Sequence, residues 1–254
     1  MLSIVLIGTG NVAQQLYAAL DNKKGVKIIQ VIGRDKKKLI PFNNCPNTAT
    51  NFEHILDSNI YIIAVNDDSI FPVAQHFKNI SGLLVHTSGT IPLSILPPSV
   101  RRGVFYPLQT ISKERKIDFS AVPICIEAEN SEDYDVLTEL ANTISNQVQI
   151  MTSDQRKLVH LAAVFVNNFT NHLYHIGSEI CNEAEVPFTI LNQLILETAK
   201  KATQTPVLNA QTGPAIRNDK LTMKQQLELL NNKNYRDIYS VISNSIQKTH
   251  GNKL

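Results

Sequence analysis

The stretch LSIVLIGTGNVA, residues 2–13, decides the fold of this chain. A mostly apolar run leads directly into a G-x-G-x-x-A pattern, which predicts a buried strand, a tight turn and the start of a helix. In this pattern the first Gly permits the turn, the second leaves room for a diphosphate beside the backbone, and the Ala allows helix and strand to pack closely. The N–H groups and the dipole of the helix favour an anion there. We therefore expect a bound dinucleotide, the alternative being a turn without a ligand; the expected contacts are Gly8, Thr9, Gly10, Asn11, Val12 and Ala13.

The second predicted strand, residues 25–32, indicates which dinucleotide binds. Sites that prefer NAD carry an Asp or Glu at the end of this strand, which accepts hydrogen bonds from the ribose. Here the strand ends in Gly33-Arg34, and the Arg34 guanidinium could hold a 2′-phosphate through two hydrogen bonds. We therefore expect NADP rather than NAD. Asp35 could serve the ribose instead if Arg34 points away, and the three lysines that follow could simply be the solvated start of a helix.

Composition limits the possible function classes. The chain has 254 residues, 43% of them hydrophobic, and a formal net charge of +2, which is too small to indicate nucleic-acid binding. Its three cysteines stand far apart and favour neither a disulfide framework nor a zinc site, which fits a reducing cytoplasm. The N-terminal apolar run lacks a basic segment before it, and no run approaches the roughly 18 apolar residues of a membrane span. We expect a cytoplasmic protein that does not bind membranes.

The pattern of predicted secondary structure changes near residue 151. Before it, short apolar runs alternate with helical segments, which is typical of an α/β fold with a parallel sheet covered on both faces. After it the pattern is helical throughout. We expect a nucleotide-binding domain over residues 1–151 and an all-helical domain over residues 152–254, packed without a flexible linker. The expected strands are 2–7, 25–32, 59–65, 82–86, 103–106, 122–127 and 147–151.

The loops that follow the strands are the expected place of the chemistry, because ligands of open α/β sheets bind at the carboxyl ends of the strands. Ala64, Val65 and Asn66 are expected to line the ribose and nicotinamide side of the cofactor. Ser88 and Gln109 are expected to face the substrate, although Ser88 could equally belong to a simple turn. The two aspartates after Asn66 are more simply interpreted as helix caps.

Residues 153–185 are expected to form one long helix that ends before Pro187. Polar side chains recur on it at helical spacing, and such groups need partners when buried, from a substrate or from the neighbouring domain. His160 is the candidate proton donor, because imidazole titrates near neutral pH, and Asn167 and Asn168 are expected to face the substrate. The expected stripe consists of His160, Val164, Asn167, Asn168, Asn171 and His175.

No metal is expected on this helix. His172 and His175 are three residues apart, and Glu179 follows four residues later. A further convincing ligand is missing, and histidines on helices are commonly surface or packing residues.

The chain resembles, over essentially its full length, bacterial proteins that join a Rossmann-like domain to a helical domain of unknown function. These are related to the superfamily of deazaflavin-dependent NADP oxidoreductase, pyrroline-5-carboxylate reductase and 6-phosphogluconate dehydrogenase. The stretches that carry the resemblance are residues 7–13, 64–67, 86–89, 106–110, 163–171 and 212–217.

The resemblance implies hydride transfer between NADP(H) and a small carbonyl, imine or hydroxy acid, and a homodimer formed through the helical domains. One departure from the relatives concerns a Lys that hydroxyacid dehydrogenases place four residues before an Asn on the interdomain helix. Here Ala163 and Val164 stand in that place. The acid–base role would pass to His160 or be absent, and the alternative function is a non-catalytic NADP-binding sensor or interaction protein.

Overall fold

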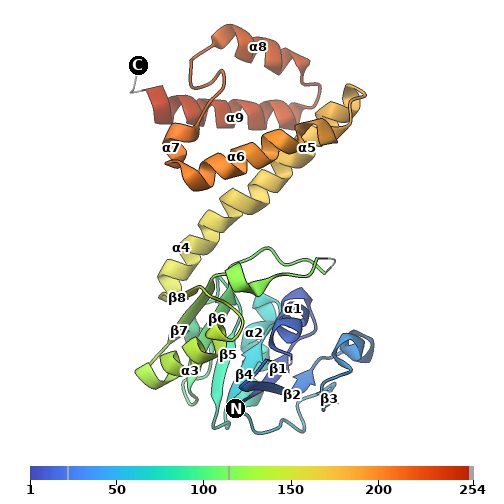
Figure 1. Cartoon of the computed structure of the whole chain (residues 1–254), viewed down its shortest axis with the longest axis vertical. Coiled ribbons are helices and arrows are strands. Elements are labelled where there is room, and N and C mark those ends of the chain that lie inside the picture. The colour runs from blue at the N-terminus through green and yellow to red at the C-terminus, as the bar shows by residue number, and fades with distance from the viewer. Residues whose placement is uncertain (22, 114, 252–254) are drawn as a thin grey trace. The chain divides into compact units, whose positions relative to one another are not determined.

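The computed structural model describes residues 1–21, 23–113 and 115–251 (Figure 1). It forms two compact units, Met1–Asn167 and Asn168–Leu254. The boundary expected after residue 151 marks the end of the last strand, and it stays a prediction of domain organisation. The first unit therefore includes the helix that follows that strand.

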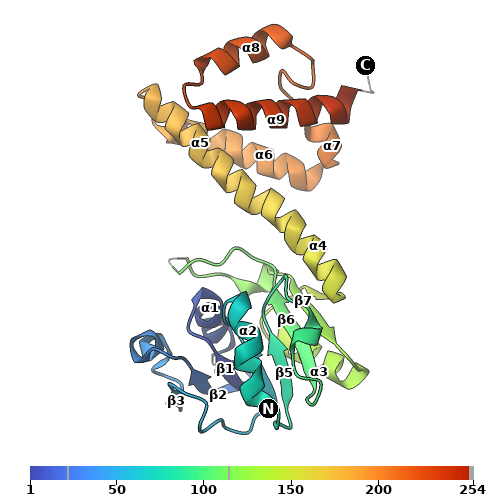
Figure 2. The same ribbon diagram turned by 180° about the vertical axis from the view of Figure 1, so that it is seen from behind.

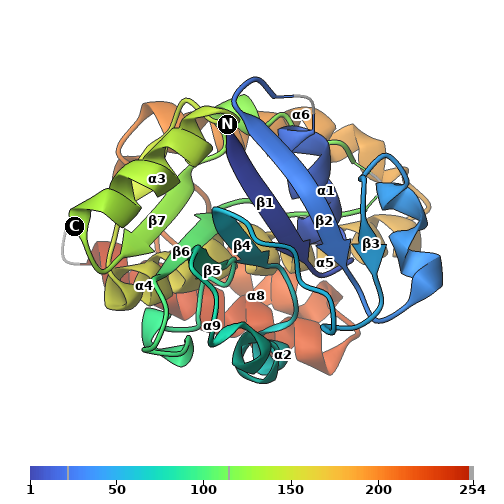
Figure 3. The ribbon, with the colours of Figure 1, turned by 90° about the horizontal axis from the view of Figure 1, so that it is seen from below.

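The first unit contains an eight-stranded sheet in the order β3-β2-β1-β4-β5-β6-β7-β8, shown from below in Figure 3. Its first six strands have the order of a dinucleotide-binding sheet, with β1 beside β4 at the point where the strand order reverses. The expected α/β class is confirmed. Strand β3, which pairs with the end of β2, was not expected. The strands are β1 Leu2–Ile7, β2 Val26–Ile32, β3 Thr48–Ala49, β4 Ile60–Ile63, β5 Leu83–His86, β6 Arg102–Pro107, β7 Ile124–Ala128 and β8 Val148–Ile150.

Strand β7 departs from the expected parallel arrangement, because it pairs antiparallel with β6 while β8 pairs parallel with β7. The backbone N–H of Leu108 donates to the carbonyl oxygen of Pro123 at 2.9 Å. The connection between β6 and β7 therefore ends at the edge of the sheet where it began, and β7 has to run back. A parallel pair would need a crossover to the opposite edge.

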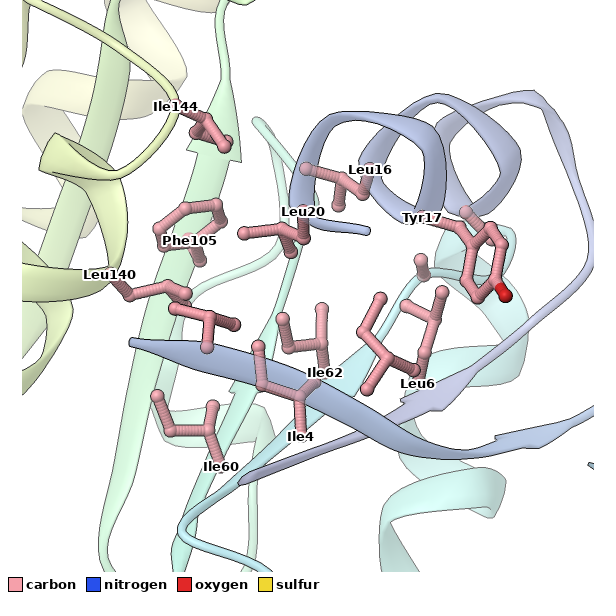
Figure 4. Packing of buried hydrophobic residues seen from close by; sticks show 14 of the residues in the cluster. Ile4, Leu6, Leu16, Tyr17, Leu20, Ile60, Ile62, Phe105, Leu140 and Ile144 are labelled. Atoms are coloured by element: carbon pink, nitrogen blue, oxygen red, sulfur yellow. The ribbon is translucent and has the colours of Figure 1, made fainter. Parts of the chain in front are cut away.

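Two apolar layers cover the two faces of the sheet. Helices α1 (Asn11–Leu20) and α3 (Ser131–Asn142) lie on one face, where Leu16, Leu140 and Ile62 belong to one buried cluster (Figure 4). Helix α2 (Asp67–Ala74) lies on the other face, where Ile70 and Phe77 belong to a second buried cluster (Figure 3). Strands covered on both faces need continuous apolar runs, which is why β4 and β5 are fully buried along their length.

Helix α4 (Ser153–Ala163) begins at a capping box, in which the side chains of Thr152 and Gln155 each bond to the other's backbone N–H. A π-helical segment, Val164–Phe169, joins it to α5 (Thr170–Glu183), so the long helix expected from the sequence is present. The wider π turn adds residues relative to an α-helix. The polar stripe expected from His160 to His175 at α-helical spacing is therefore not continuous across this segment.

The second unit is helical over its described residues, and Figure 2 shows its helices from behind. A four-residue helix, α7, follows Pro206. No helix of the described residues is long and apolar enough to cross a membrane. The remaining helices are α6 Asn192–Gln204, α7 Val207–Ala210, α8 Lys220–Leu229 and α9 Lys233–His250.

Candidate functional site

The turn between β1 and α1 forms an open cradle. Gly8 has a φ of +124°, and a Cβ there would lie 2.1 Å from the carbonyl oxygen of Ala64, so only glycine fits. Gly10 is the N-cap of α1, and no atom lies within 4 Å of where its Cβ would stand. No side chain caps α1, and its first turn carries no acidic residue. Its first N–H groups are thus left for an anion, as a bound diphosphate requires.

Arg34 and Asp35 follow the end of β2, and both are exposed. The Asp35 carboxylate accepts a hydrogen bond of 2.8 Å from the backbone N–H of Lys37 and caps the short 3-10 helix Lys36–Phe42. Within the described ranges, Arg34 takes part in no ion pair. The carboxylate that could have served a ribose is therefore engaged, whereas the guanidinium beside it is available.

The loop after β5 is held by hydrogen bonds of Ser88. The Ser88 hydroxyl accepts from the backbone N–H groups of Thr90 and Ile91, each at 3.1 Å, and lies 3.2 Å from the Thr90 hydroxyl. Thr90 donates to the Asp67 carboxylate at 2.5 Å, which joins this loop to the start of α2. Ser88 is only 7% exposed, so these contacts favour the simple turn over a substrate contact. Asp67 also sits in the first turn of α2, whereas Asn66, the N-cap, makes no side-chain cap.

His86, at the end of β5, is fully buried. Its Nδ1 accepts a hydrogen bond of 3.2 Å from the backbone N–H of Ser88. Burial, with a smaller effect from the positive charge of Arg156, lowers the pKa of His86 to about 3. The side chain is neutral at ordinary pH and holds the loop, so it is a poor proton donor.

Tyr106 meets His160 beside this loop. The hydroxyl of Tyr106, at the end of β6, lies 3.0 Å from Nδ1 of His160 on α4. A Cβ on Gly89 would lie 2.6 Å from the same nitrogen and 3.0 Å from the Tyr106 oxygen. The absence of a side chain at Gly89 thus allows the loop to lie directly against the pair. Burial raises the pKa of Tyr106 to about 12, so its hydroxyl keeps its proton at ordinary pH.

Arg156 fixes α4 on the sheet. It is completely buried, forms an ion pair with Glu127 on β7, and donates to the carbonyl oxygen of Ile91 at 2.6 Å. Ser153 adds a backbone and a hydroxyl bond to the same carboxylate, at 2.8 and 2.9 Å. Because Arg156 lies one helical turn before His160, this network also fixes where His160 enters the site.

The other expected residues are more dispersed. Gln109 is exposed, and its side-chain oxygen accepts from the neighbouring N–H of Thr110 at 2.9 Å. Asn167 and Asn168 are exposed on the π-helical segment, and Asn11 donates to the carbonyl oxygen of Ile111 at 3.4 Å. Their expected roles, like that of His160, stay predictions. Ala64 and Val65 lie directly beside Gly8.

Two residues of this region were not singled out from the sequence. Tyr106 is the first residue of the stretch 106–110, which carries part of the family resemblance, so its position was a usable signal. Arg156 had no such signal, since an arginine on an amphipathic helix is usually exposed. Among the described residues, no three His, Cys, Asp or Glu side chains are grouped so that they could hold a metal ion.

Solved structures similar to this chain cover nearly all of it. A crystal structure of a Bacteroides fragilis protein, provisionally named an NADP oxidoreductase, is 37% identical to it with a TM-score of 0.88, over 97% of this chain and 98% of the other. The chain belongs to the family of this protein. Residues 122–246 match the model of a domain of unknown function, DUF2520. The resemblance inferred from the sequence is confirmed. No curated protein matches the chain.

More distant structures share the fold. The protein TM1727 of Thermotoga maritima is 19% identical, with a TM-score of 0.75, over 98% of this chain and 99% of the other. An imine reductase of Myxococcus stipitatus, in complex with NADP+, is 15% identical, with a TM-score of 0.70, over 98% and 96%. At these identities the likeness concerns the fold alone, so function has to be argued from the site.

Proposed function

We propose that the chain is an NADP-dependent oxidoreductase that transfers a hydride to or from a small carbonyl, imine or hydroxy acid. The observation that carries the proposal is the uncapped start of α1 beside the open position of Gly10. Arg34 adds an available cation at the end of β2. The provisional name of the Bacteroides relative, and the NADP+ bound by the imine reductase of the same fold, support it.

In this proposal, different residues bind the cofactor and supply the proton. The first N–H groups of α1 bind the diphosphate, Arg34 binds the 2′-phosphate, and Ala64, Val65 and Asn66 line the nicotinamide side. When bound, the nicotinamide supplies or accepts the hydride. His160 supplies the proton, because it is the partly exposed imidazole at the loop after β5. Ser88, Gln109, Asn167 and Asn168 stay candidates for substrate contacts.

Replacing Arg34 with Ala tests the cofactor assignment. We expect NADPH affinity to fall by about 10- to 100-fold while NADH affinity changes little, because one set of charge-assisted hydrogen bonds to phosphate is lost. Isothermal titration calorimetry with both nucleotides measures the two affinities. Lys37→Ala is the matched control, since it removes the same charge three residues away and leaves the backbone N–H that donates to the Asp35 carboxylate. Equal losses for NADPH and NADH would contradict the assignment, and no binding of either by the wild type would contradict the proposed function.

We also propose that the second unit is the interface of a homodimer. Of its described residues, the buried apolar ones are only Ile176 and Ala215, whereas Leu194 on α6 is 63% and Val241 on α9 is 68% exposed. A unit of this size with so small a core needs a further apolar surface against it. A second copy supplies a self-complementary one.

Sedimentation velocity of the full chain tests the dimer. We expect twice the mass of one chain for the wild type, and a shift toward the monomer for Leu194→Glu, because a buried charge without a partner destabilises an interface. Gln193→Glu introduces the same charge about 100° around the helix and serves as the control. A wild-type chain that sediments as a monomer at all concentrations would refute the proposal.

A further inference from the structure

We propose that Tyr106 is a positioning residue for His160: its hydroxyl holds Nδ1, so that Nε2 is the nitrogen that exchanges a proton with the substrate. This inference rests on the proposed function in one respect, namely that His160 is the proton donor. Tyr106 itself does not touch the reacting atoms. It acts through the imidazole.

One hydrogen bond joins the Tyr106 hydroxyl to the His160 ring. The Tyr106 oxygen and Nδ1 of His160 are 3.0 Å apart, and both residues belong to the first unit. A neutral imidazole has one N–H donor and one acceptor nitrogen, and the other ring nitrogen is left for a different partner. A phenol both donates and accepts, so it can bond to Nδ1 whether or not that nitrogen carries a proton. The pair therefore keeps its contact in the neutral and in the protonated state of His160.

When His160 is neutral, Tyr106 is the donor of this hydrogen bond. The Tyr106 hydroxyl keeps its proton, because burial raises its pKa to about 12. Among the described residues, Nδ1 of His160 is the polar atom within hydrogen-bond distance of that hydroxyl. A partly buried hydroxyl normally satisfies its donor, which here means donation to Nδ1. Neutral His160 then carries its own proton on Nε2.

Neighbouring residues hold the Tyr106–His160 pair rigidly in place. Gly89 lies so close that any side chain there would displace the imidazole or the phenol. Arg156 fixes α4 one turn earlier through Glu127 and Ile91. The ring of His160 is thus held from the loop after β5, from the end of β6 and through its own helix. Such fixed orientation is what a proton donor needs beside a reacting carbon.

The proton balance of the step is simple. In the reducing direction the cofactor supplies the hydride, and protonated His160 supplies only the proton. The Nε2–H bond breaks, an O–H or N–H bond forms on the substrate, and His160 is left as the other neutral tautomer, with its proton on Nδ1 donated to the Tyr106 oxygen until the ring is protonated again. Water then returns a proton to the ring. In the oxidising direction Nε2 accepts the proton from the neutral tautomer that carries its proton on Nδ1, where the Tyr106 oxygen accepts the Nδ1–H hydrogen bond.

Nitrogen-15 NMR of the imidazole rings in the full chain tests the hydrogen bond without any substrate. We expect the Nδ1 signal of neutral His160 to shift in Tyr106→Phe toward that of a nitrogen without a hydrogen bond, while the other histidines stay unchanged. His160→Asn assigns the signal, and Tyr134→Phe on α3 is the matched control. An identical Nδ1 signal in the wild type and in Tyr106→Phe would overturn the proposal, whatever the cofactor experiments show.

Turnover tests the consequence, with 1-pyrroline as the imine probe and NADPH as the reductant. We expect Tyr106→Phe to lower kcat about tenfold with an unchanged KM for NADPH, and His160→Asn to lower it by about 100-fold or more. If His160→Asn abolishes turnover but Tyr106→Phe does not reduce it, the positioning role is wrong. If the wild type does not bind NADPH, the proposed function is refuted, and the NMR result still stands.

Discussion

Replacing Gly10 with Asp is expected to lower the affinity for NADPH by about 100-fold or more without unfolding the chain. Gly10 precedes the first turn of α1 with an extended backbone, φ −75° and ψ −176°, which suits an aspartate cap. No atom lies within 4 Å of the site of its Cβ, so the new side chain meets no obstacle. Its carboxylate would bond to the same N–H groups that the diphosphate needs, and it would repel the phosphates. About 100-fold corresponds to roughly 2.7 kcal/mol, about the value of one or two charge-assisted hydrogen bonds.

The same substitution is expected to leave the melting temperature unchanged or slightly higher, because Asp is a better N-cap than Gly by a few tenths of a kcal/mol. Calorimetric titration and thermal unfolding on one preparation measure both effects. Gly10→Ser caps the helix without a charge and should lose less affinity. Asn232→Asp adds the same charge at the N-cap of α9 and should lose none. Undiminished NADPH affinity in Gly10→Asp would show that the start of α1 is not the phosphate site.

Much of the sheet could be predicted from the sequence, because its determinants are local. The glycine turn after residues 2–7 marks β1, continuous apolar runs mark β4 and β5, and a mostly apolar run marks β2. The direction of β7 could not be predicted, since an apolar run looks the same in either direction. It depends on a connection that returns to the edge where β6 ends, at the contact between Leu108 and Pro123. Likewise, nothing local distinguishes the π turn of residues 164–169 from an α-helix.

The candidate site, like the sheet, could be predicted from the sequence only where its determinants are local. The Gly8 and Gly10 positions follow from backbone geometry and were predicted. The contact between Tyr106 and His160 joins residues far apart in the chain, and it exists because α4 is fixed on β7. Ser88 illustrates the converse. A serine at a strand end suggests a substrate contact, but its hydroxyl is engaged by the backbone of its own turn.

Replacing Arg156 with Met is expected to destabilise the first unit by about 3 to 5 kcal/mol. The substitution leaves the carboxylate of Glu127, which is 14% exposed, without its cation, and it leaves the carbonyl oxygen of Ile91 without its donor. Removing one partner of a buried pair costs far more than the pair contributes, because the other charge stays desolvated. Since typical proteins are stable by 5–15 kcal/mol, this loss is a large fraction of the total. The midpoint of urea unfolding measures it.

Two further variants separate the desolvated charge from lost packing. Lys233→Met breaks the exposed ion pair with Asp237 and should hardly move the urea midpoint, since such pairs contribute little. The double variant Arg156→Met with Glu127→Leu removes both charges, and we expect it to recover much of the stability, as apolar replacements of buried pairs commonly do. If the double variant is as unstable as Arg156→Met, packing and the bond to Ile91 dominate. The ion pair would then be a consequence of the position of α4 rather than its cause.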